Sequence, residues 1–228
     1  TLIVGQKCSG ATLMFRYCLM IIKSKRKKEI NMAIRTTAIL NLKGGVAKTT
    51  TTINMAALLA KNYGKRVLLI DADSQCNVTE FFGGETSGNT MANVLRDSRF
   101  YNEPEAVAVM AIQQTEFKGV DLIPGDESLM DMDLSAASQG TVDTNVLRYL
   151  VEAVKDRYDY ILIDCPPSLS MLTINALTAS DGVIIPMQCE YYALEGLTQL
   201  MLTIRNVKKL YNHDLSILGI LITMYNGR

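Results

Sequence analysis

The chain has 228 residues, 48 % hydrophobic and 20 % charged, which is ordinary for a soluble protein with one well-buried domain or at most two small ones. Its one histidine, His213, and its five cysteines without a C-x-x-C pair argue against histidine-based catalysis, a zinc site and a disulfide framework. The formal net charge is zero, so overall basicity gives no argument for nucleic-acid binding.

The first 31 residues carry seven basic side chains against one acid, Glu29. The apolar run at residues 11–22 contains Arg16 and is too short to span a bilayer. The basic cluster at residues 23–28 follows this run, whereas a signal peptide has its charges first. A basic tail that touches a membrane is one interpretation. We expect instead that the domain begins at Met32 and that residues 1–31 are an extension, disordered or non-native.

From Ile34 onward, short β-rich runs alternate with stretches of helical periodicity. The predicted strands are residues 36–42, 65–73, 120–125, 158–167, 181–187 and 216–224. The predicted helices are residues 49–62, 91–96, 103–111, 129–137, 144–156, 171–179 and 194–210. This order predicts an α/β fold with a mostly parallel twisted sheet and helices on both faces. Residues 32–228 are expected to form one domain, truncated at its C-terminus because no helix follows the last strand.

The first strand leads into the segment NLKGGVAKTT, residues 41–50. A glycine-rich turn lets backbone amides approach a phosphate, and the N-terminus of the following helix adds its dipole. Gly44, Gly45 and Val46 can form that turn. Lys48 would reach the β- and γ-phosphates, and the Thr49 hydroxyl would ligate Mg²⁺. The segment therefore predicts a nucleoside-triphosphate site.

The common pattern G-x-x-x-x-G-K-[ST] requires a glycine where this chain has Leu42, and Lys43 precedes the glycine pair instead. The segment resembles the deviant Walker A loop, K-G-G-x-G-K-T-T, of the ParA/MinD superfamily of P-loop ATPases. The resemblance implies ATP and Mg²⁺ as cofactors, and a homodimer in which Lys43 reaches the partner's ATP. Ala47 stands in place of the third glycine. If the backbone there is left-handed, the Cβ costs roughly 1–2 kcal/mol; if φ is negative, the methyl group is merely tight against the phosphate. Weaker nucleotide binding is expected.

Two further segments resemble the same superfamily. LLIDADSQCNVT, residues 68–79, is similar to its switch I motif D-x-D-P-Q-G-N, with Ser74 and Cys76 in place of proline and glycine. The resemblance implies that Asp71 orients the attacking water. ILIDCPPSL, residues 161–169, resembles Walker B and switch II, which implies that Asp164 holds Mg²⁺.

Residues 183–200 and 218–228 resemble the ParA (Soj) branch, the partitioning ATPases. In that branch the second segment lines the adenine pocket. The expected catalytic residues are Lys43, Lys48 and Asp71, and Thr49 and Asp164 are the expected metal ligands. The expected nucleotide contacts are Lys43, Gly44, Gly45, Val46, Ala47, Lys48, Thr49, Thr50, Thr223, Met224 and Asn226.

The basic residues Arg205, Lys208 and Lys209 lie on one predicted helix. They are either a solvated helix face or, as the resemblance implies, part of a patch that binds DNA without sequence preference.

The leading hypothesis is a slow, cytoplasmic, nucleoid-associated ATPase that dimerises on ATP and is stimulated by a ParB-type partner to segregate chromosome or plasmid DNA. A membrane-positioning ATPase of the MinD kind and a non-hydrolysing, ATP-dependent regulatory switch are the alternatives.

Overall fold

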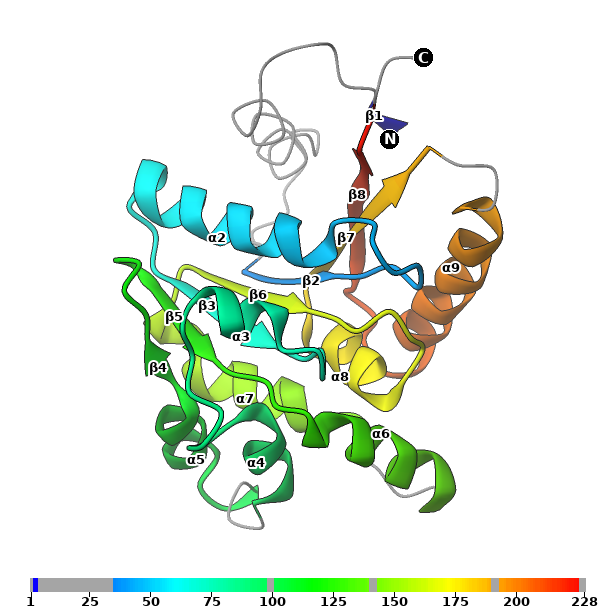
Figure 1. The fold of residues 1–228 in the computed structure, drawn as a ribbon. Helices are drawn as coiled ribbons and strands as arrows, with labels where there is room; N and C mark the ends of the chain where they lie inside the picture. The colour runs from blue at the N-terminus through cyan, green and yellow to red at the C-terminus, as the bar shows by residue number, and fades with distance from the viewer. Residues whose placement is uncertain (1, 4–34, 98–100, 140–142, 190–192, 226–228) are drawn as a thin grey trace.

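A computed structural model describes residues 2–3, 35–97, 101–139, 143–189 and 193–225. The eight strands in these ranges form one sheet with the order β1-β8-β7-β2-β6-β3-β5-β4 (Figure 1). Every described pair is parallel except β4 and β5, which are antiparallel. The predicted mostly parallel sheet is therefore confirmed.

The strands are β1 (Leu2–Ile3), β2 (Thr36–Ile39), β3 (Val67–Asp71), β4 (Gln113–Gln114), β5 (Val120–Ile123), β6 (Tyr160–Asp164), β7 (Gly182–Gln188) and β8 (Ser216–Thr223). The α-helices are α2 (Lys48–Tyr63), α3 (Asn77–Phe81), α4 (Met91–Arg96), α5 (Pro104–Ala111), α6 (Ser128–Gln139), α7 (Val146–Val154), α8 (Met171–Ala179) and α9 (Ala193–Leu210). A 3₁₀ turn, η2 (Lys155–Arg157), follows α7.

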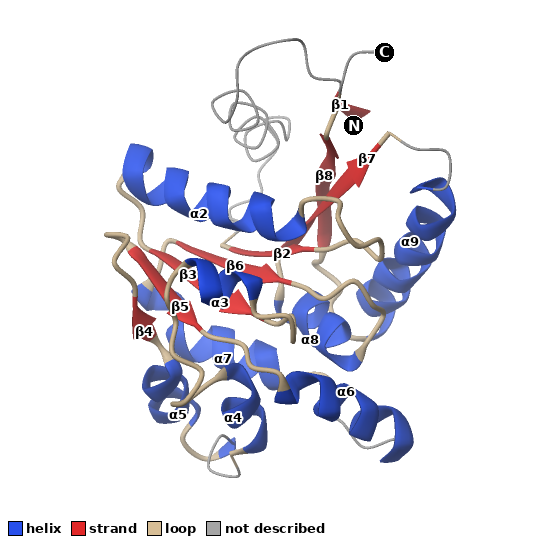
Figure 2. Ribbon diagram, viewed as in Figure 1, coloured by secondary structure: helices blue, strands red, loops and turns tan. Residues whose placement is uncertain are grey.

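Helices cover both faces of the sheet, as Figure 2 shows. Alternate residues of each central strand enter different cores, because successive side chains point to opposite faces. In β6, Leu162 packs in the core beneath α2, whereas Ile161 and Ile163 pack in the larger core with α7, α8 and α9. The central strands are thus buried on both faces, which explains their continuous apolar sequences.

All predicted strands and helices from residue 36 onward are present, with boundaries shifted by a few residues. The first strand ends at Ile39 rather than residue 42, because the chain there leaves the sheet to form the loop before α2. The sequence missed α3 and β4, which have five and two residues. Elements this short bury too few side chains to leave a periodic pattern.

Most of the N-terminal segment lies outside the described residues, so its expected disorder remains a prediction. Its described part, Leu2–Ile3, forms β1 and pairs in parallel with β8. Among the described helices, none is long and apolar enough to cross a membrane.

The pairing register brings the expected site together. Ile39 of β2 is level with Asp164 of β6, which in turn is level with Asp71 of β3. Because these strands are parallel, the loops that leave their carboxyl ends meet at one edge of the sheet.

Candidate functional site

The centre of the site is the loop between β2 and α2, residues 40–47, which we call the phosphate loop. Lys43, Gly44 and Gly45 are exposed on it, and Val46 is buried. Gly45 has φ 72° and Ala47 has φ 67°, so two left-handed residues flank Val46. Such alternation curls successive amides around a concavity that suits an anion.

Ala47 is the last residue before α2 and has φ 67° and ψ 36°. A Cβ in this conformation costs roughly 1–2 kcal/mol, since only glycine adopts it freely. Of the two backbone conformations considered from the sequence for Ala47, the left-handed one, which carries the cost of a Cβ, is the one observed. The strain persists because the surrounding strands hold the loop in place.

The phosphate loop is fixed by its own Asn41 and by two side chains at the ends of β7 and β8. The Asn41 amide donates to Pro186 O (2.6 Å), and its Oδ1 accepts the Lys43 N–H (3.1 Å). The Gln188 amide donates to Gly45 O (2.9 Å), and the Thr223 hydroxyl donates to Val46 O (3.1 Å). The sequence did not identify Asn41 or Gln188, because no local pattern reports a contact across more than 140 residues.

Lys48 is the first residue of α2 and is buried, at 7 % exposure. Its Nζ donates to Lys43 O at 3.3 Å. Burial lowers the pKa of Lys48, while the nearby carboxylates of Asp164 and Asp73 act in the opposite direction. A partly desolvated ammonium next to converging amides is a strong attractor for phosphate oxygens.

Asp164, at the end of β6, is buried below Thr49 and Thr52 of α2. The two threonine hydroxyls donate to its carboxylate oxygens, at 2.7 Å and 2.8 Å. Burial nevertheless raises the pKa of Asp164 to about 7, with Asp71 and Asp73 adding repulsion. A buried carboxylate that resists ionisation is stabilised in its charged form by a cation.

The oxygens of Thr49 and Asp164 fit Mg²⁺, which prefers hard oxygen ligands. No group of three or more His, Cys, Asp or Glu residues in the described ranges could hold a metal by itself. A cation here would therefore take its remaining ligands from phosphate and water, as Mg²⁺ commonly does.

Asp71 does not face the phosphate loop freely. It is fully buried, and its Oδ2 accepts both the N–H and the hydroxyl of Thr79, at 2.8 Å and 2.7 Å. Its Oδ1 accepts the Asp73 N–H at 3.3 Å. Gly125 N donates to the same Thr79 hydroxyl (2.9 Å), which encloses the carboxylate further. The sequence could not reveal this enclosure, because the helix that supplies Thr79 was not predicted.

Residues 72–76 form the loop after β3, which we call the switch loop. Like the phosphate loop, it ends with a non-glycine residue in left-handed backbone directly before a helix. Cys76 precedes α3 with φ 54°, at the position where the switch I motif has glycine. Burial, with Asp71 and Asp126 nearby, raises the pKa of its thiol to about 12, so the sulfur is a neutral thiol rather than a nucleophile.

The expected base-side residues lie at the end of β8. Thr223 is buried against the phosphate loop, whereas Met224 is exposed and has φ 52°. The Gln188 amide also contacts Met224 Sδ. Asn226 lies outside the described residues. Thr223 thus contacts the phosphate loop directly, and Met224 is connected to it through Gln188.

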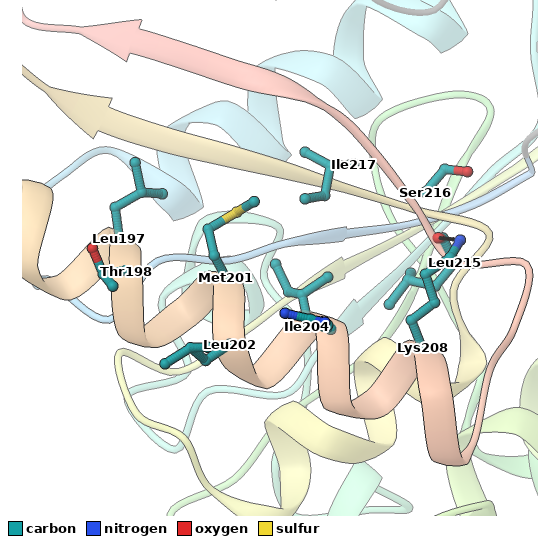
Figure 3. A pocket seen from close by; sticks show the side chains of 10 residues that line it. Leu197, Thr198, Met201, Leu202, Ile204, Lys208, Leu215, Ser216 and Ile217 are labelled. Atoms are coloured by element: carbon teal, nitrogen blue, oxygen red, sulfur yellow. Dashed lines mark hydrogen bonds between the residues drawn. The ribbon is translucent and has the colours of Figure 1, made fainter.

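The three basic residues expected to contact DNA are exposed on α9. Lys208 donates to Leu215 O at 2.5 Å. Arg205 and Lys208 border an apolar groove of about 890 Å³ between α9 and β8, where Leu197 and Met201 point toward Ile217 (Figure 3).

A parallel sheet with a phosphate loop, a buried lysine at the helix start, and acids at the ends of adjacent strands defines a P-loop nucleoside-triphosphatase. A model of the AAA domain family matches residues 34–217. The sporulation initiation inhibitor protein Soj of Bacillus subtilis is 48 % identical over 84 % of this chain and 73 % of its own length. The chromosome partitioning protein ParA of Caulobacter vibrioides is 46 % identical over 86 % of this chain and 71 % of its own length.

Among solved structures, a cobyrinic acid a,c-diamide synthase from Mycobacterium smegmatis with bound ATP analog and magnesium is similar, with a TM-score of 0.71 and 35 % identity. The match covers 86 % of this chain and 77 % of that one. The chain belongs to the ParA/Soj family of partitioning ATPases, as its motifs indicated.

Proposed function

We propose that the phosphate loop binds ATP with Mg²⁺ and that the hydrolysis of this ATP drives the partitioning of chromosomal or plasmid DNA. The observation that carries the proposal is the junction of α2 with β6, where Lys48 lies beside Asp164 and Thr49 is hydrogen-bonded to it. The cation would compensate the negative charge of the buried Asp164 carboxylate, and Lys48 would compensate the negative charge of the phosphates. Gly44, Gly45, Val46, Ala47 and Thr50 complete the nucleotide contacts.

Lys43 is proposed to act across a homodimer. It is exposed on the phosphate loop, whereas Lys48 at the start of α2 is buried, so we assign the two lysines to different nucleotides of the dimer. In an ATP-bound dimer, Lys43 would approach the partner's γ-phosphate and stabilise the charge that develops there. Turnover stays slow until the dimer assembles.

Asp73 is the better candidate than Asp71 for orienting the attacking water. The Asp71 carboxylate already accepts the donors of Thr79 and Asp73, and would have to leave the buried contacts with α3 to meet a water. Asp73 acts electrostatically on Lys48, which places its charge at the phosphate loop. We therefore assign the water to Asp73 and a structural role in the switch loop to Asp71.

The DNA-binding function is proposed for Arg205, Lys208 and Lys209 on α9. Cationic side chains bind backbone phosphates without reading sequence, so affinity should fall steeply with salt. A ParB-type DNA-binding partner is proposed to stimulate hydrolysis and release the dimer. The proposed location is the bacterial nucleoid.

A steady-state ATPase assay with DNA and a ParB-type partner tests this function. The parent chain should hydrolyse ATP slowly alone and faster with both additions, and should form a dimer with ATP but not with ADP. Lys43→Ala should lose the ATP-dependent dimer and the stimulation. Lys61→Ala, which changes an exposed lysine at the far end of α2, is the matched control and should behave as the parent. Identical behaviour of Lys43→Ala and the parent would contradict the dimer mechanism.

Vesicles of anionic lipid, added with and without ATP beside a DNA-binding measurement, distinguish DNA partitioning from a membrane-positioning function. ATP-dependent binding to DNA alone supports the proposal, and ATP-dependent binding to vesicles alone overturns it.

A further inference from the structure

The geometry points to Gln188, the last residue of β7, as a positioning residue that aims the phosphate-binding amides and couples them to the base-side end of β8. This inference rests on the proposed function of the phosphate loop as an ATP site. It adds a residue that lies outside that loop in sequence and was absent from the predicted site.

The contact with Gly45 fixes the direction of a backbone amide. Gln188 Nε2 donates to Gly45 O at 2.9 Å. The C=O of one residue and the N–H of the next belong to one planar peptide unit and point in opposite directions. Holding the Gly45 carbonyl toward β7 therefore aims the Val46 N–H away from Gln188. That N–H is one of the donors expected to bind a phosphate oxygen.

The neighbouring peptide is held in the same way from β8. The Thr223 hydroxyl donates to Val46 O at 3.1 Å, which aims the Ala47 N–H. Two consecutive peptide units are thus oriented by side chains from two different strands. Both units adjoin the left-handed residues Gly45 and Ala47, where the backbone would otherwise relax most readily.

The Gln188 side chain contacts both the phosphate loop and the base-side residue Met224. Its amide carries two N–H groups, and Nε2 also donates to Met224 Sδ on the base side. Met224 has a left-handed backbone with φ 52°, so its placement also depends on external contacts. A displacement of Gly45 would therefore be transmitted through this amide to Met224, in addition to the direct contact between Thr223 and Val46.

Glutamine suits this position for a physical reason. Glutamate has the same shape but offers only acceptors at neutral pH, and leucine has a similar volume without donors. Loss of the donor frees the Gly45 carbonyl to bond to water and the peptide to rotate, so amides must be reordered when phosphate binds. The free-energy cost of this reordering should weaken the binding of ATP and leave the rate of the chemical step nearly unchanged.

Equilibrium titrations of the full chain with Mg²⁺–ATP and with inorganic tripolyphosphate, combined with steady-state kinetics, test the inference. Gln188→Leu should bind tripolyphosphate on the order of 3- to 10-fold more weakly, the loss expected for one hydrogen bond. ATP binding should weaken more, so that the preference for ATP over tripolyphosphate narrows. Turnover at saturating ATP should stay within about twofold, since uniform binding is lost.

Gln188→Glu, of the same shape, should weaken ATP more than Gln188→Leu, because it places a carboxylate against the Gly45 carbonyl and near the phosphates. Gln199→Ala, on the exposed face of α9, is the matched glutamine control and should leave both affinities unchanged.

The inference and the proposed function fail in different ways. A folded parent chain that does not bind ATP overturns both. A parent that binds ATP, together with a Gln188→Leu variant of unchanged affinity and unchanged preference, overturns only the role of Gln188. A lower midpoint of thermal unfolding in Gln188→Leu with unchanged affinities would likewise contradict it, since that result describes a purely structural side chain.

Discussion

The phosphate loop and the switch loop each place a non-glycine residue in left-handed backbone directly before a helix, yet they are held in different ways. Ala47 precedes a helix of 16 residues, and side chains of β7 and β8 fix the loop before it. Cys76 precedes a helix of five residues, and the side-chain contact that holds this segment joins Asp71 to Thr79, eight residues apart. Side chains from distant strands fix the phosphate loop, whereas the switch loop is held from further along the chain by backbone N–H groups, those of Ala72 to Asp164 O and of Gly125 to the Thr79 hydroxyl.

This difference separates the two tasks of a nucleotide switch. A phosphate site gains affinity when its amides are ordered before the ligand arrives. A loop that reports hydrolysis must move at low cost, and short helices with local contacts open most easily. We expect the switch loop to move and the phosphate loop to stay in place.

The largest expected effect removes the acid beneath the phosphate loop. Asp164→Asn should reduce Mg²⁺-dependent ATP hydrolysis by roughly 100-fold or more, because a neutral amide holds the cation poorly. The measurement is turnover as a function of Mg²⁺ concentration. Turnover equal to that of the parent at every Mg²⁺ concentration would remove Asp164 from the site.

Although Asp164→Asn should impair hydrolysis, the same substitution should stabilise the nucleotide-free protein at high pH. Burial raises the pKa of Asp164 to about 7, above that of the carboxyl in the unfolded chain. Its contribution to stability is therefore present below the unfolded pKa and is lost as the pH rises through about 7. The free energy of unfolding of Asp164→Asn, measured relative to that of the parent, should be roughly 2 kcal/mol higher at pH 8 than at pH 5.5. Urea denaturation at the two pH values measures this, and a constant difference would contradict it.

The two acids of the switch loop should respond differently. Asp73→Asn should lower turnover by roughly 100-fold with little change in ATP affinity, since general-base contributions have that size. Asp71→Asn should mainly lower the free energy of unfolding, by about 1–3 kcal/mol, because the buried donors of Thr79 lose a charged acceptor. Single-turnover kinetics and urea denaturation distinguish them. The reverse pattern would restore Asp71 as the residue that orients water.

A smaller effect comes from removing the Ala47 methyl group in the phosphate loop. Ala47→Gly should bind ATP up to about 10-fold more tightly, because the methyl group no longer limits the approach of phosphate; the left-handed strain is present without nucleotide and should affect stability instead. Titration of both forms with ATP tests this. Equal affinities would mean that the methyl group does not limit the approach of phosphate.

The smallest effect is expected at the equivalent position of the switch loop. Cys76→Gly should raise the free energy of unfolding by at most about 1 kcal/mol, since relief of strain is partly offset by the larger entropy of glycine in the unfolded chain. Denaturation under reducing conditions measures it. Destabilisation would show that the Cys76 side chain contributes packing that outweighs the backbone strain.

The sequence predicted the sheet, the order of the longer elements, and the residues of the phosphate loop, because these depend on local periodicity and on spacing along the chain. It could not predict that Asp71 is enclosed, since α3 is too short to leave a pattern. Nor could it predict Gln188, whose partner lies 143 residues away in the chain. The left-handed backbone of Ala47 was recognised only as one of two cases, because a substituted glycine position does not disclose its own φ.

A calorimetric titration of Mg²⁺–ATP into the parent chain and into Lys48→Ala tests most directly whether residues 44–49 bind the triphosphate. The parent chain should bind one ATP, and the affinity of the variant should be at least about 100-fold weaker, because the loss of a buried ammonium leaves the phosphates without their main charge partner. Equal affinity in the two folded proteins would contradict the assignment of residues 44–49 as the triphosphate site.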